Sequence, residues 1–134
     1  MTPASAGSAL THLDGICLAD GGMETTLIFH HGLDLPHFAA FTLLASDDGR
    51  GALASYYDAY LAVAEERGVP IVLDTATWRA SADWGDLLGY SPEQLADANR
   101  QAVATVRAAS RAGRRLPSSA APSGRVATAT SPTY

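Results

Sequence analysis

A long amphipathic segment followed at once by a short apolar run is the feature that most limits how this 134-residue chain can fold. After a turn at Asp47-Asp48-Gly49, the segment Gly51 to Arg67 predicts a helix that ends at Gly68. Its apolar face has members at spacings of three and four, namely Leu53, Tyr56, Tyr57, Tyr60, Leu61 and Ala64. The run Val69 to Thr75 comes next and predicts a strand covered on both faces of a sheet. A helix that is followed directly by a buried strand is typical of a parallel sheet.

Similar signals flank this pair. Gly15 to Ala19 is a short apolar run that ends in glycine, which predicts a buried strand. Met23 to His30 predicts a short helix with Gly32 as its stop. Ser91-Pro92-Glu93-Gln94 is a capping box with proline at the first helical position, and it opens a helix that extends to about Ala112. The order strand, helix, strand, helix predicts an α/β fold.

The charge distribution divides the chain into unequal parts. All fourteen acidic residues lie at or before Asp97, whereas six of the nine arginines lie after it. We therefore expect a disordered leader at 1–13, a folded part at 14–112 and an irregular tail at 113–134. Two parallel strands leave both edges of their sheet open, so the folded part resembles a piece of a larger fold. The alternative is a small non-catalytic α/β module that oligomerises through those edges.

Composition excludes several classes of protein. The chain has no run of about 18 apolar residues, so no membrane span is expected, and its net charge of −5 argues against a nucleic-acid surface. The single cysteine, Cys17, cannot form an internal disulfide and fits a reducing cytoplasm. We expect it to pack in the first strand as a small apolar side chain. His30, His31 and His37 point in different directions, so no metal site is expected from them.

Two short polar segments follow the predicted strands. Asp20-Gly21-Gly22 follows the first strand: its glycines let a backbone approach a ligand closely, and its carboxylate can hold an ammonium group. Asp74 to Trp78 follows the second strand and offers hydroxyls beside an indole. Loops after parallel strands face the same edge of a sheet. The alternatives are a tight turn with a solvated aspartate and a simple strand terminus.

The order of four segments resembles the homocysteine S-methyltransferase family. The first, LADGGMETTLIFHHGLDLP, is similar to the opening DGGMGTxL motif of that family, and the later ones are YYDAYLAVAEERGV, LDTATWRAS and LGYSPEQLADANRQAV. The resemblance covers about residues 17–110. It implies a (β/α)8 TIM barrel, of which this chain holds the first two βα units, and a substrate site at the carboxyl ends of the strands. The substrate-binding residues that it implies are Asp20, Gly21, Gly22, Glu24, Thr75 and Thr77.

The resemblance also implies a chemistry. Members of the family transfer a methyl group from a sulfonium, betaine-like or folate donor to the sulfur of homocysteine, which gives methionine. In the family three cysteines hold a zinc ion that keeps the substrate thiol deprotonated. Those cysteines belong to later GGNC-like and GGCC-like motifs, and neither motif occurs here. We therefore expect no catalytic residue, no metal ligand and no activity in this chain by itself. Glu24 stands where many members have glycine, which leaves the exact thiol substrate and the donor open.

The tail suggests a hypothesis about the gene. When each codon is read one base earlier, Ser118 to Thr130 can encode V-I-S-G-A-V-G-P-R-G-D-G-Y, which is similar to the third strand and loop of the family. A shifted reading frame would explain why the family-like pattern stops near residue 112. The alternative is a genuine C-terminal tail, and sequencing the locus distinguishes the two.

Overall fold

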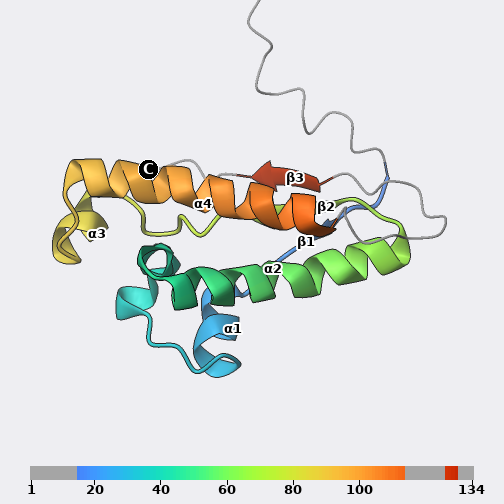
Figure 1. The fold of residues 1–134 in the computed structure, drawn as a ribbon, viewed down its shortest axis with the longest axis horizontal. Helices are drawn as coiled ribbons and strands as arrows, with labels where there is room; N and C mark the ends of the chain where they lie inside the picture. The colour runs from blue at the N-terminus through green and yellow to red at the C-terminus, as the bar shows by residue number, and fades with distance from the viewer. Residues whose placement is uncertain (1–14, 114–125, 130–134) are drawn as a thin grey trace, which may run out of the picture.

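The computed structural model describes residues 15–113 and 126–129 (Figure 1). In chain order its elements are β1 (Leu18–Ala19), α1 (Met23–Phe29), the short 3-10 helices η2 (Pro36–Phe38) and η3 (Ala40–Ala45), α2 (Asp47–Arg67), β2 (Ile71–Asp74), α3 (Ala82–Leu87), α4 (Pro92–Gly113) and β3 (Val126–Ala129). The three strands form one parallel sheet in the order β1-β2-β3. The predicted α/β class with a parallel sheet is therefore confirmed.

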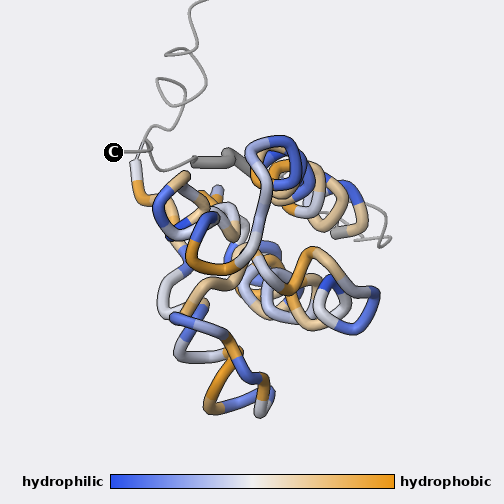
Figure 2. Tube along the Cα trace, turned by 90° about the vertical axis from the view of Figure 1, so that its left-hand side faces the viewer, coloured by the Kyte–Doolittle hydropathy of each residue, from blue (hydrophilic) through white to orange (hydrophobic). Residues whose placement is uncertain are grey.

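The two long helices form a layer beside the sheet. Helices α2 and α4 pack against each other, α2 also contacts β2, and α4 contacts β3 (Figure 1). Figure 2 shows hydrophobic and hydrophilic residues alternating around these helices, as amphipathic helices require. The core lies between the layers, and its largest fully buried side chains are Leu27, Phe41, Leu44, Leu53, Tyr56, Tyr57, Ile71, Leu73 and Val106. The predicted helical face of α2 is thus core, with only Tyr60 partly exposed.

Strand β2 is covered less evenly than its sequence predicts. Ile71 and Leu73 are buried, whereas Val72 is half-buried and Asp74 is exposed. The alternation arises because successive side chains point to opposite faces and the helices cover the face of Ile71 and Leu73. The prediction that both faces are covered is not met by the part of the chain that the structure describes.

The first strand is shorter than predicted. Pairing with β2 joins Leu18 to Ile71 and Ala19 to Val72, and the strand is limited to these two residues. Cys17 precedes the strand and is exposed. The expectation that Cys17 packs as a core side chain is therefore wrong, because the residue lies outside the ladder that would bury it.

Helix α2 begins earlier than predicted. The predicted turn Asp47-Asp48-Gly49 is its first turn, and Ser46 caps it by accepting a hydrogen bond from the backbone N–H of Gly49 at 3.0 Å. The two aspartates suit this position because the helix dipole favours negative charge there. Gly68 ends the helix in the left-handed conformation (φ 64°), as predicted.

Helix α4 begins as the sequence predicts, with both bonds of its capping box formed. The hydroxyl of Ser91 accepts from the N–H of Gln94 at 3.1 Å, and the Gln94 side chain accepts from the N–H of Ser91 at 2.9 Å. Helix α3 was not predicted, because its six residues are too few to show a helical period. None of the helices within the described ranges has the length and apolar character that a membrane crossing needs.

The predicted tail contains a strand. Val126–Ala129 pairs in parallel with Ile71–Asp74, so this part of the range 113–134 is regular rather than irregular. A parallel neighbour completes backbone hydrogen bonds that β2 would otherwise offer to solvent. The leader at 1–13 and the remainder of the tail lie outside the described residues, and so does most of the segment to which the frame hypothesis applies.

Candidate functional site

The carboxylate of Asp20 joins the ends of two strands. Its Oδ1 accepts a hydrogen bond from the backbone N–H of Asp74 at 2.7 Å, and its own backbone N–H donates to the carbonyl of Val72 at 3.3 Å. The two polar segments that follow β1 and β2 are thereby brought to one edge of the sheet. This is the edge at which parallel folds bind small molecules.

Three tyrosines of α2 donate hydrogen bonds to groups at this edge of the sheet. The hydroxyl of Tyr56 donates to Oδ2 of Asp20 at 2.8 Å, and that of Tyr60 donates to the carbonyl of Gly21 at 2.8 Å. The hydroxyl of Tyr57 donates to the carbonyl of Asp74 at 2.7 Å. Burial, reinforced by Asp20, raises the pKa of both Tyr56 and Tyr57 well above its ordinary value of 10.0. Both hydroxyls therefore remain hydrogen-bond donors across the physiological pH range.

The sequence pattern predicts Tyr56, Tyr57 and Tyr60 as part of an apolar helical face rather than as site residues, because their rings have the spacing of a core. The signal that could have revealed them is the presence of three phenol groups within five residues, since buried hydroxyls need partners.

Three carboxylates gather at the strand ends. Burial raises the pKa of Glu24, the charges of Asp74 and Asp20 add to this effect, and a backbone hydrogen bond and Arg79 oppose it. Burial also raises the pKa of Asp74, and Asp20 acts in the same direction. Like charges disfavour one another's ionisation, so the group favours a ligand that brings positive charge. Asp20 and Glu24, predicted as binding residues, thus belong to one electrostatic cluster.

The remaining predicted residues occupy the two loops. Gly22 adopts the left-handed conformation (φ 65°) at the N-terminus of α1, which explains the need for glycine there. Gly21 is exposed, with open space where a side chain would stand. Thr75 is buried, and its hydroxyl lies 2.8 Å from that of Thr77. Thr75 follows Asp74 directly, and Thr77 lies two residues further along the same loop.

The cluster retains hydrogen-bonding capacity for a ligand. A carboxylate offers about four acceptor positions, and the described contacts of Asp20 use two of them. With Gly21 exposed beside it, an ammonium group can reach the carboxylate without meeting a side chain at that position. The arrangement is suited to binding the amino end of a small amino acid.

The donor set does not fit a zinc ion of the kind that the family resemblance implies. Within the described ranges no three histidine, cysteine or acidic side chains are placed to hold a metal. The sequence has one cysteine, and Cys17 precedes β1 rather than following it. The carboxylates at the strand ends are hard oxygen ligands, whereas thiol activation uses sulfur-rich zinc sites.

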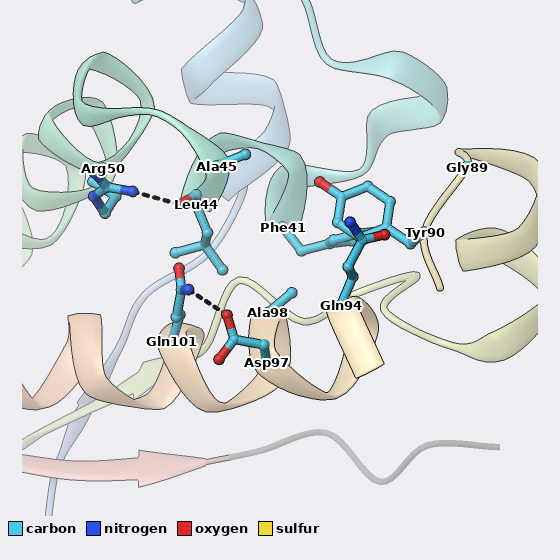
Figure 3. Close-up of a pocket in the computed structure, with 10 residues that line it drawn as sticks. All are labelled: Phe41, Leu44, Ala45, Arg50, Gly89, Tyr90, Gln94, Asp97, Ala98 and Gln101. Carbon is cyan, nitrogen blue, oxygen red and sulfur yellow. Dashed lines mark hydrogen bonds between the residues drawn. The ribbon is translucent and has the colours of Figure 1, made fainter. Parts of the chain in front are cut away.

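A separate groove of about 360 Å³ lies between η3 and the first half of α4 (Figure 3). Phe41 and Leu44 form its apolar side. Several of its polar groups already have partners: Arg50 donates to the carbonyl of Leu44 at 2.7 Å and pairs with Asp47, and Gln101 donates to Asp97 at 2.6 Å. None of the predicted substrate residues lines this groove.

The structure is that of an α/β protein with polar and acidic groups gathered at the carboxyl ends of parallel strands. The family model described as Homocysteine S-methyltransferase matches residues 17–134. The chain belongs to this family, whose members transfer a methyl group to the sulfur of homocysteine. The matched range extends through the tail, beyond the segments that carry the resemblance in the sequence. No curated protein and no solved structure matches the chain.

Proposed function

We propose that this chain forms the amino-acid-binding part of a homocysteine S-methyltransferase barrel, with residues 14–112 as the N-terminal part of that barrel. Family membership supports the substrate class, and the carboxylate of Asp20 between two strand ends is the observation that carries the site. The substrate's ammonium group would lie against the carboxylate of Asp20, beside the open backbone at Gly21. Glu24 would add charge, and Thr75 and Thr77 would line the same pocket.

The sheet topology supports the proposal of a partial (β/α)8 barrel. The strands are parallel and adjacent in chain order, and helices connect each to the next. A barrel of this type requires that order, whereas doubly wound sheets reverse direction at a switch point. The uncovered face at Val72 would then be the interior of the barrel.

Zinc would be needed to keep the substrate sulfur as a thiolate, and the residues of this chain do not supply its ligands. No step of methyl transfer is therefore assigned to them. What they can do is bind and orient an amino acid through its charged end, which fixes the direction in which the thiol points.

Calorimetric titration of the chain with L-homocysteine tests the proposal. An excess of reductant is needed because exposed Cys17 would otherwise exchange with oxidised homocysteine. We expect Asp20→Asn to weaken binding about tenfold or more, since a charge-assisted hydrogen bond becomes a neutral one. Asp58→Asn, at an exposed position of α2, is the matched control and should bind as the unaltered chain does. Equal affinities of the Asp20→Asn variant and the unaltered chain would overturn the proposal.

A further inference from the structure

Both tryptophans of the chain lie against one arginine. The guanidinium carbon of Arg79 is 4.4 Å from the ring centre of Trp78 and 4.1 Å from that of Trp84. Trp84 comes from α3, whereas Trp78 and Arg79 belong to the loop after β2. Two such contacts fix the plane of the guanidinium group more firmly than the aliphatic stem of arginine alone could.

The backbone at this stack is in an uncommon conformation. Arg79 has a φ of 65°, and His37, whose ring lies 5.7 Å from that of Trp84, has a φ of 53°. Residues other than glycine adopt the left-handed region at a cost, and such positions concentrate at ligand sites. Among the described residues Phe38 (φ 59°) is the third such position outside glycine, so two of the three lie at the aromatic stack and the third adjoins His37 in the sequence.

The N–H groups of Arg79 are available to a ligand. Within the described residues its side chain makes no hydrogen bond and no ion pair, although its position is fixed by the two indoles. Indole rings contact the faces of a guanidinium group, and the donors lie around its edge. An oriented edge with free donors matches the two oxygens of a carboxylate.

The position of Arg79 relates it to the substrate site. It lies two residues after Thr77, and its charge is close enough to Glu24 to favour the ionised form of that carboxyl group. Thr77 and Arg79 belong to one turn, in which the N–H of Ala80 donates a hydrogen bond to the carbonyl of Thr77 at 2.9 Å. Negative groups at the strand ends and one oriented cation beside them complement the two charges of a free amino acid.

We propose that Arg79, held between Trp78 and Trp84, binds the carboxylate of the amino-acid substrate while the group around Asp20 binds its ammonium. This rests on the proposed function and adds a specificity-determining residue to it. The site then selects amino acids over amines with the same thiol. Lysine cannot replace Arg79, because an ammonium group has no planar fork and no flat face for two indoles.

The test compares L-homocysteine with 3-aminopropane-1-thiol, which has the same amine and thiol but no carboxylate. We expect the unaltered chain to bind homocysteine at least tenfold more tightly in calorimetric titrations under reductant. Arg79→Lys and Arg79→Gln should reduce this ratio to near one by weakening homocysteine alone. Arg107→Gln, at an exposed position of α4, should leave the ratio unchanged. Tryptophan fluorescence should change with homocysteine but not with the amine, because both indoles of the chain contact Arg79.

The outcomes separate this inference from the function on which it rests. If homocysteine binds and Asp20→Asn weakens it, but both Arg79 variants keep the ratio, the assignment of Arg79 is overturned and the substrate site stands. If the unaltered chain binds neither compound, both proposals are overturned. Far-ultraviolet circular dichroism of the variants shows whether their folds match that of the unaltered chain.

Discussion

The side chain of Asp20 has a structural role and a proposed binding role at the same time. Its carboxylate accepts one hydrogen bond from the backbone of Asp74 and another from the hydroxyl of Tyr56. These bonds fix the orientation of the carboxylate before any ligand arrives, which lowers the entropy lost on binding. A solvated aspartate in a tight turn, the alternative considered from the sequence, would have no such partners.

Tyr56→Phe should destabilise the fold by about 1.5 to 3 kcal/mol, because it removes a donor to the Asp20 carboxylate. Tyr60→Phe removes an exposed hydrogen bond to a neutral carbonyl and should cost about 1 kcal/mol or less. Urea denaturation followed by circular dichroism measures both changes. Equal losses of stability in the two variants would show that the hydrogen bond to Asp20 contributes no more to the fold than the one to the carbonyl of Gly21.

Glu24 should make the stability of the fold depend on pH. Because burial raises its pKa above the ordinary value of 4.5, its contribution to stability is fully present below pH 4.5 and is lost as the pH rises through the folded-state pKa. Glu24→Gln mimics the protonated form, so it should match the unaltered chain at low pH and be more stable at neutral pH. Urea denaturation across this range measures the difference, with Glu66→Gln, exposed on α2, as the control.

At the scale of elements, α2 connects the site to the core. One side of the helix supplies buried rings, and the hydroxyls of three of its tyrosines reach the loops that follow β1 and β2. Its first turn packs closely on η3, where a side chain on Gly49 would overlap the carbonyl oxygen of Leu43. The start of α2 is therefore held close to the backbone of η3.

Two glycines in the first turns of α2 should respond oppositely to alanine. Gly49→Ala should destabilise the fold by about 1 to 3 kcal/mol, because the backbone of η3 must move. Gly51→Ala should stabilise it by about 0.5 to 1 kcal/mol, since this exposed helical position has open space around it. Thermal and urea denaturation measure both. A gain in stability from Gly49→Ala would contradict the close packing of η3 on α2.

At the scale of the whole molecule, β1 and β3 are the outer strands of the sheet among the residues that the structure describes. In a closed barrel such strands would pair with further neighbours, whereas an outer strand without a partner presents a hydrogen-bonding edge. The alternative of a small oligomerising module would use the same edges between copies. Light scattering over a range of concentrations distinguishes a monomeric species from one that associates through its strands.

The chain by itself should form no methionine from homocysteine and a methyl donor, with or without added zinc. One cysteine cannot supply the three thiolate ligands that the family's zinc ion uses. Homocysteine binding should nevertheless persist, because it depends on the charged end of the amino acid. Chromatographic assay of methionine checks this. Zinc-dependent methionine formation that increases linearly with protein would overturn the prediction.

Elements whose signals are local could be predicted from the amino-acid sequence. The capping box at Ser91 and Gln94, the stop at Gly68 and the apolar face of α2 all depend on residues a few positions apart, so their chemistry can be recognised without a fold. The loops after the strands were also placed at one edge by the parallel order. The assignment of substrate roles stays a prediction for all six residues, which are Asp20, Gly21, Gly22, Glu24, Thr75 and Thr77.

Only the tertiary structure decided which partners meet across long separations. The bond from Asp74 to Asp20 spans 54 positions and that from Tyr56 to Asp20 spans 36, and no periodicity encodes either. The stack of Arg79 on Trp84 likewise depends on α3, a helix too short to be predicted. Strand register and helix packing set these contacts, because they bring together atoms of residues that lie far apart in the sequence.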